Sequence, residues 1–151
     1  MHRRGISLSH SALTLFHMSG YSGTPLLKKL GIKPGFRIYI SEPPEDYYSW
    51  LAPLPDEIVV NEKLAGEFDF IHLFVKTNKA FQRQFLRSAG KLKKNGMLWI
   101  SWPKRASKVP TDLDENIIRD FGLQNGLVDV KVCAIDETWS GLKFVFRLQD
   151  R

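Results

Sequence analysis

The chain has 151 residues, of which 43% are hydrophobic, 12% aromatic and 25% charged, a balance that fits one globular domain and excludes a largely disordered protein. Its single cysteine, Cys133, excludes an internal disulfide and a cysteine-based metal cluster, which suits a reducing compartment. The formal net charge of +6 favours anionic partners without choosing among phosphates, nucleic acid and acidic surfaces.

The first 17 residues have the outline of a secretory signal but lack its continuous apolar region. Arg3 and Arg4 precede the stretch 6–16, which serines, a histidine and a threonine interrupt, and no small-residue cleavage site precedes Met18. We expect 1–17 to be a disordered leader, or residues translated upstream of a start at Met18, and 18–151 to form a single domain. No apolar run has the length of a membrane span, so we expect no membrane partner.

Helix signals and apolar runs alternate through the first half of the domain. Thr24 is a predicted N-cap, with Pro25 at the first position of a helix that Gly31 ends. The run 68–75, FDFIHLFV, is almost continuously apolar, which is typical of a strand covered on both faces in a parallel sheet. The other elements expected here are a strand over 36–40, a helix over 45–51 and a strand over 57–60.

The second half repeats the alternation and ends in two strands. Asn78 is the predicted N-cap of a helix whose apolar face extends to Leu92, whose last turn holds the lysines of 91–94, and which Asn95 and Gly96 close. A strand over 97–102 follows. Thr111 and Asp114 resemble a capping pair for a helix that reaches Gly126. The segments 128–135 and 141–146 are expected to form an antiparallel pair.

This order predicts a three-layer α/β sandwich of the Rossmann-like type. Its sheet should be mostly parallel, with about six strands, right-handed crossovers and a C-terminal antiparallel hairpin. Ligands of such sheets bind beyond the carboxyl ends of the strands, near the switch in strand order. The residues that follow the predicted strands are therefore the candidate site.

Parts of the second half resemble class I S-adenosylmethionine (SAM)-dependent methyltransferases. The resemblance rests on the strand 68–72, FDFIH, on the segment 92–100, LKKNGMLWI, and on the final hairpin. It implies a SAM cofactor held by a glycine-rich turn after the first strand and by an acidic residue that ends the second. Here Ser41, Glu42 and two prolines follow the first strand, and only Glu62 loosely matches the acidic residue. The sequence therefore argues against SAM binding in the usual manner.

Longer strings resemble the bacterial family catalogued as domain of unknown function 3052. They are 20–26, GYSGTPL; 29–35, KLGIKPG; 97–104, MLWISWPK; and 136–143, DETWSGLK. The resemblance covers nearly everything from Gly20 to Arg147. It implies the same fold in a bacterial cytoplasmic protein and brings no activity with it.

The candidate ligand-binding residues come from three places that the fold should bring to one rim. Lys104 follows a predicted strand together with Arg105 and Lys108, and Trp102 beside them is suited to stacking on a ring. The loop before the first helix offers backbone N–H groups to an anion. Its candidates are Gly20, Tyr21, Ser22 and Thr24, and the remaining candidates are Ser41, Glu42, Lys76 and Trp139. A solvated loop, helix capping and a hairpin turn would equally explain these residues.

The sequence contains no recognised set of catalytic residues and no metal-binding motif. His72 lies in the most apolar strand, where a buried histidine held by one hydrogen bond is expected. Cys133 alternates with apolar residues, so we expect it to have a structural role. We interpret Asp136 and Glu137 as residues of the hairpin turn. The lysines at 28–29 and 91–94 fall on amphipathic helices without a recognised reader motif, so no sequence-specific nucleic acid is expected.

Three functions remain open at this point. The first is a non-enzymatic or cryptic module that binds an anionic, nucleotide-like small molecule at the carboxyl ends of the strands. The second is a SAM-dependent methyltransferase with an atypical cofactor loop. The third is a protein–protein interaction module whose contact surface is marked by Trp50, Trp102 and Trp139.

Overall fold

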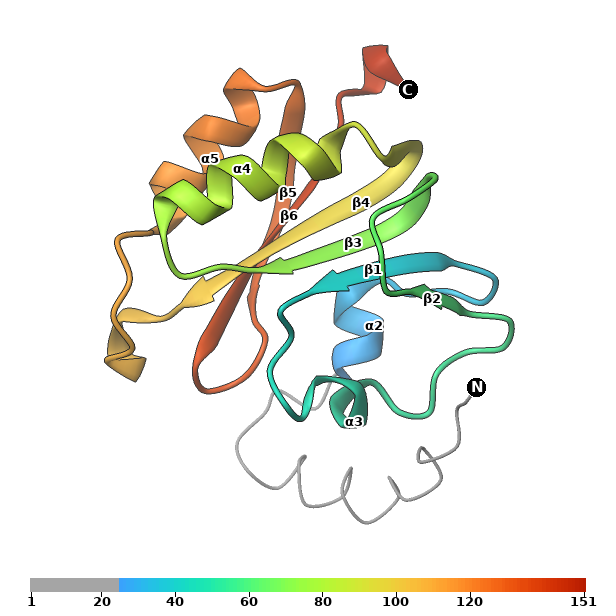
Figure 1. Cartoon of the computed structure of the whole chain (residues 1–151), viewed down its shortest axis with the longest axis horizontal. Coiled ribbons are helices and arrows are strands. Elements are labelled where there is room, and N and C mark those ends of the chain that lie inside the picture. The colour runs from blue at the N-terminus through green and yellow to red at the C-terminus, as the bar shows by residue number, and fades with distance from the viewer. Residues whose placement is uncertain (1–24) are drawn as a thin grey trace.

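A computed structural model describes residues 25–151 and shows one six-stranded sheet between two layers of helices (Figure 1). The strand order is β2-β1-β3-β4-β6-β5. Strands β2, β1, β3 and β4 are parallel to one another, and β6 is antiparallel to both β4 and β5. The strands are β1 (Arg37–Ser41), β2 (Val59–Asn61), β3 (Phe68–Phe74), β4 (Leu92–Pro103), β5 (Leu127–Ala134) and β6 (Trp139–Phe146). The predicted α/β sandwich with its antiparallel C-terminal strands is confirmed.

Each face of the sheet is covered by its own pair of helices. Phe81 and Phe85 of α4 (Asn78–Ala89) and Ile118 of α5 (Glu115–Gln124) pack on one face. Leu30 of α2 (Leu26–Leu30) and Tyr47 of α3 (Tyr47–Leu51) pack on the other. The short 3₁₀ helices are η2 (Arg105–Ser107) and η3 (Leu148–Asp150). Among the described residues, no helix has the length and apolar character needed to cross a membrane.

The largest correction to the predicted elements concerns the segment after α4. The helix ends at Ala89 with Gly90 as its C-cap, and β4 already begins at Leu92, so the lysines at 93 and 94 lie on a strand. Leu92 pairs with Phe68, and the register then shifts before Met97 pairs with Phe70. Gly96 is required in this irregular stretch, because a Cβ there would lie 2.9 Å from the Phe68 carbonyl oxygen. Asn95 and Gly96 are therefore part of β4 and do not close a helix.

Three predicted helix caps also differ. Thr77, and not Asn78, caps α4, because its side chain accepts a hydrogen bond from the Ala80 N–H. Asp114 caps α5 as expected, whereas Thr111 takes no part in that cap. Pro25 is the N-cap of α2 and does not occupy its first turn. The leader 1–17 and the candidates Gly20, Tyr21, Ser22 and Thr24 lie outside the described residues.

Candidate functional site

The candidate site lies at the edge of the sheet where the parallel strands end. Because β1, β3 and β4 run in the same direction, Ser41, Lys76 and Lys104 follow or end their strands at this one edge. Strand β6 begins there, since it is antiparallel to β4, and Pro103 pairs with Trp139. The Lys104 N–H donates to the Thr138 carbonyl over 2.7 Å, which ties the end of β4 to the final hairpin.

The sheet separates the two tryptophans proposed for this edge. Trp102 is 6% exposed and belongs to the core on the α4 and α5 side. Trp139 packs on the opposite side, edge-to-face with Phe74 at a centroid distance of 5.1 Å. The two indoles therefore lie on opposite faces of the sheet. Because Trp102 is buried, it does not contribute to the exposed surface through which an interaction module was expected to contact its partner.

A pocket of about 410 Å³ lies at the end of β4, between η2 and the first turn of α5. Its lining includes two basic residues, Arg105 and Lys108, together with Leu113, Trp102 and one acidic residue, Asp114. Lys76, Lys104, Ser41, Glu42 and Trp139 do not line it. The complete lining is Trp102, Pro103, Arg105, Lys108, Val109, Pro110, Thr111, Leu113 and Asp114.

Hydrogen bonds within the loop hold the pocket wall in place. Thr111 Oγ1 donates to the Lys76 carbonyl over 2.6 Å and accepts from the Leu113 N–H over 3.1 Å. Ser107 Oγ donates to the Lys104 carbonyl over 2.7 Å and accepts from the Val109 N–H over 3.2 Å. These bonds connect the loop to the ends of both β3 and β4, so the wall is built on the sheet.

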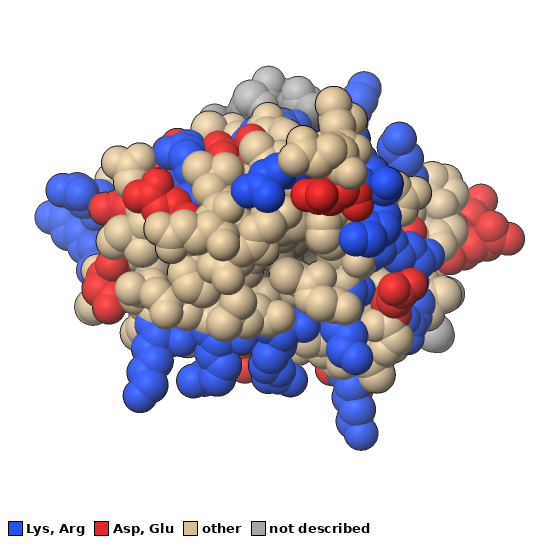
Figure 2. Space-filling view, turned by 90° about the horizontal axis from the view of Figure 1, so that it is seen from above, with Lys and Arg blue, Asp and Glu red and all other residues tan. Residues whose placement is uncertain are grey.

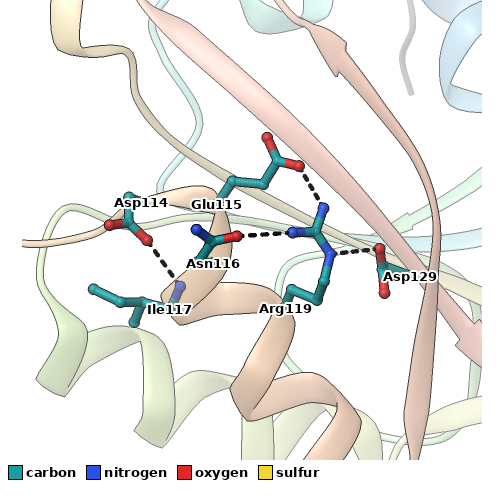
Figure 3. Close-up of polar contacts among 6 residues, drawn as sticks. All are labelled: Asp114, Glu115, Asn116, Ile117, Arg119 and Asp129. Carbon is teal, nitrogen blue, oxygen red and sulfur yellow. Dashed lines mark hydrogen bonds and ion pairs between the residues drawn. The ribbon is translucent and has the colours of Figure 1, made fainter.

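The first turn of α5, which directly follows the lining residue Asp114, is fixed to strand β5 through Arg119 (Figure 3). The guanidinium group donates to Asp129 over 2.8 Å, to Asn116 over 3.1 Å and to Glu115. The hydrogen bonds that Arg119 donates to Asp129 and then to Glu115 raise the pKa of Arg119 above its ordinary value. Since Arg119 is charged in any case, the consequence is positional: it holds the start of α5 beside the pocket.

The charges in the pocket favour an anion. Arg105 and Lys108 are exposed and form no ion pair with a residue in 25–151. Asp114 is the one acidic lining residue, and one of its carboxylate oxygens already accepts from the Ile117 N–H over 2.8 Å. Two cations against one carboxylate leave the lining with a net charge of +1. Within the described part of the chain, no group of three His, Cys, Asp or Glu residues is placed to hold a metal.

A separate polar network lies in the core beneath this edge. His72 Nδ1 is 2.8 Å from the Tyr47 hydroxyl, and His72 Nε2 is 2.8 Å from Ser101 Oγ. All three residues are fully buried, and burial lowers the pKa of His72 to about 3. His72 was expected to make one hydrogen bond and makes two. Because all three groups are buried and bonded to one another, the network joins α3 to β3 and β4.

The resemblance expects SAM to be held at two strand ends. The turn after β1 does not suit the cofactor, whereas the residue after β2 does. After β1, Glu42 adopts a left-handed backbone conformation (φ 54°), and the following Pro43 and Pro44 have no N–H to donate. Ser41 is buried and donates to Gln84 Oε1 of α4 over 2.8 Å, which closes this strand end. Glu62, by contrast, directly follows β2 as the resemblance requires. Burial, and then the charge of Glu62, raise the pKa of Tyr48 in α3, which places that tyrosine near the carboxylate.

Comparison with known proteins gives the fold. No family model matches the chain, so its relation to domain of unknown function 3052 stays a prediction. No curated protein matches either. Several solved methyltransferase structures do match. The chain has a Rossmann-like methyltransferase fold.

Three of the matching structures show how far the likeness extends. The DhpI–SAH complex aligns with a TM-score of 0.59 at 9% identity, over 95% of each chain. A SAM-dependent methyltransferase from Aquifex aeolicus gives 0.56 at 13% identity, over 96% of this chain and 100% of its own. Magnesium protoporphyrin IX methyltransferase from Synechocystis PCC 6803 with bound SAH aligns with a TM-score of 0.51 at 12% identity, over 95% of this chain and 84% of its own. At such identities the likeness shows the fold alone.

Sequence reasoning named the basic loop but missed the second half of the pocket. Thr111 and Asp114 are predicted only as a capping pair for a helix, and Leu113 is not singled out, although all three residues line the cavity. The available signal was position, because a loop after one parallel strand commonly folds back over the carboxyl ends of its neighbours.

Proposed function

We propose that the pocket at the end of β4 binds an anionic small molecule with a ring and a phosphate or carboxylate, of the nucleotide type. The observation that carries this proposal is the pair of cations, Arg105 and Lys108, set without acidic partners around a cavity that Trp102 also lines. A planar guanidinium pairs with phosphate or carboxylate through two parallel hydrogen bonds. A pocket of about 410 Å³ falls within the range of small-molecule sites.

Residues beside the pocket would support such a ligand. Lys104 and Lys76 follow β4 and β3 at the same edge, so they add to the positive field around the opening. No nucleophile with an adjacent base lines the cavity, so the proposal is one of binding.

The test is a thermal shift and calorimetric titration with ATP, AMP and pyrophosphate. We expect at least one of them to raise the melting temperature of the parent, since a ligand that binds only the folded state stabilises it. Arg105→Gln/Lys108→Gln should abolish the shift. Lys28→Gln/Lys33→Gln removes the same charge from exposed positions on the α2 side of the sheet and should preserve it. An equal loss in both variants, or no shift in the parent, would contradict the proposal.

SAM-dependent methyl transfer is a second candidate. It is supported by the position of Glu62 at the carboxyl end of β2, together with the fold shared with SAM- and SAH-bound structures. Bound SAM would supply an electrophilic methyl group, and Glu62 would accept hydrogen bonds from its ribose. Calorimetry with SAH distinguishes the two proposals. Binding that Glu62→Gln weakens and Arg105→Gln/Lys108→Gln leaves intact would favour the methyltransferase, and the absence of heat at millimolar SAH would dismiss it.

A further inference from the structure

The chain distributes its charge very unevenly. Between Asp69 and Asp112, residues 70–111 hold ten of the 22 Lys and Arg residues and no Asp or Glu. This segment forms most of β3, all of α4 and β4, and the loop that contains η2. Nearly half of the basic residues of the chain therefore fall in one segment that carries no acidic residue.

Helix α4 arranges part of this charge in a line, which we call the basic row: Lys79, Arg83, Arg87 and Lys91. The members are four residues apart, so each lies about one turn after the last. All four are exposed, because Phe81, Phe85 and Ser88 turn the opposite face of the helix into the core. Lys91 lies just past the helix end, where its N–H still donates to the Ser88 carbonyl over 2.9 Å. Figure 2 shows Lys and Arg side chains in such a line along the edge of the molecule where α4 lies.

The basic row has no acidic partners among residues 25–151. The four ion pairs of this region involve Lys93, Arg119 and Arg147, and none involves a member of the row. The first turn of α4 also lacks an acidic residue. The acidic residue near the start of the helix is Asp112, which accepts from the Asn78 N–H over 2.7 Å. Like charges one turn apart destabilise a helix slightly, so an anionic partner would relieve this repulsion.

From this geometry we infer that the basic row binds the sugar–phosphate backbone of nucleic acid without reading its sequence. Lys79, Arg83 and Arg87 are about 6 Å apart along the axis of α4, and Lys91 follows just past its end, so the row has a spacing of the same order as that of the phosphates along one strand. Backbone contact needs no reader motif, which agrees with the absence of one in the sequence. An anionic membrane is the weaker match, because Leu86 is the one large apolar side chain exposed on α4 and little apolar area is offered for insertion.

The test measures binding of the full chain to fluorescein-labelled RNA and DNA duplexes of about 20 base pairs and mixed sequence, by anisotropy between about 50 and 200 mM KCl. The parent should bind, and four phosphate contacts predict that log K falls with log salt at a slope of about −3.6. Lys79→Gln/Arg83→Gln/Arg87→Gln keeps good helix formers at each position. It should weaken binding at low salt at least tenfold and reduce the slope by about 2.7.

The matched control removes three charges from the other face of the sheet. Lys28→Gln/Lys29→Gln/Lys33→Gln changes α2 and the turn after it, and it should bind within about threefold of the parent. The inference is overturned if the parent shows no binding at low salt, if the control loses as much affinity as the row variant, or if the parent binds phosphatidylserine vesicles but neither duplex. Circular dichroism melts of both variants show that they fold.

Discussion

The ends of β1 and β4 lie at the same edge of one sheet and are built in opposite ways. At β1, Ser41 is buried against Gln84 of α4, and two prolines stiffen the turn. At β4, the chain passes through η2 and returns to α5, which leaves a cavity lined by Arg105 and Lys108. The fold predicts the edge at which a ligand would bind, and the local residues decide which strand end is open. In this protein the open end belongs to β4.

The strongest expected effect concerns the core network that lies under both strand ends. His72→Ala removes a fully buried ring and leaves the Tyr47 hydroxyl and Ser101 Oγ without their shared partner. We expect the free energy of unfolding to fall by about 3–5 kcal/mol, from the cavity and the two unsatisfied groups. Urea denaturation measures it. Tyr47→Phe, which loses only one hydroxyl, should cost about 1–2 kcal/mol. Equal, small losses in both would mean that the network does not hold α3 to the sheet.

The same histidine predicts a pH dependence. Its pKa is about 3 in the folded protein against an ordinary value of 6.5, so the unfolded chain binds a proton at pH values where the folded protein does not. The contribution of neutral His72 to the stability of the folded protein is therefore fully present above pH 6.5, and it is lost as the pH falls from 6.5 toward 3. Between pH 7 and pH 5 the free energy of unfolding should drop by about 2 kcal/mol. His72→Gln should remove this part of the dependence, and identical slopes for parent and variant would contradict the assignment.

Thr111→Val tests whether the loop at the β4 end is a built wall. The substitution keeps the shape of the side chain but removes the hydrogen bonds to the Lys76 carbonyl and the Leu113 N–H. We expect a loss of about 1–2 kcal/mol in stability and weaker binding of whichever anion shifts the parent. Thr111→Ser, which preserves the hydroxyl, should behave like the parent. Unchanged binding in Thr111→Val would show that the wall does not shape the pocket.

The smallest effect is expected at the closed end. Ser41→Ala removes the hydrogen bond to Gln84 Oε1, which is half-buried and can turn toward water. Stability should fall by about 1 kcal/mol or less, and anion affinity should stay within twofold of the parent. A tenfold change in affinity would place the ligand at β1 and reverse the comparison.

The sheet and the edge at which its parallel strands end could be predicted because each depends on local patterns that agree with the final packing. The apolar run 68–75 predicts a buried strand and forms β3, and the prolines after β1 and at the end of β4 predict strand ends that the structure also has. The segment 92–96 could not be predicted, since its spacing from Phe85 fits a helix equally well. Its pairing with Phe68, at a distance of 24 residues in sequence, decides for a strand.

The candidate site was only partly predictable for a similar reason. Trp102 and Trp139 both stand at the rim by strand order, and their separation depends on side-chain alternation across the antiparallel pair. The contribution of Thr111 depends on a loop that folds back over the end of β3. Charge was the more reliable guide, because the acid-free segment 70–111 is visible in the sequence, and the structure gathers part of it into the basic row.

A nuclear magnetic resonance titration tests the open β4 end most directly. In ¹⁵N–¹H spectra of the parent with increasing ATP or pyrophosphate, the backbone amides of residues 105–114 should shift in a saturable way, while those of 41–46 should stay in place. Saturable shifts confined to 41–46, with the 105–114 amides unmoved, would contradict the assignment of the ligand site to β4.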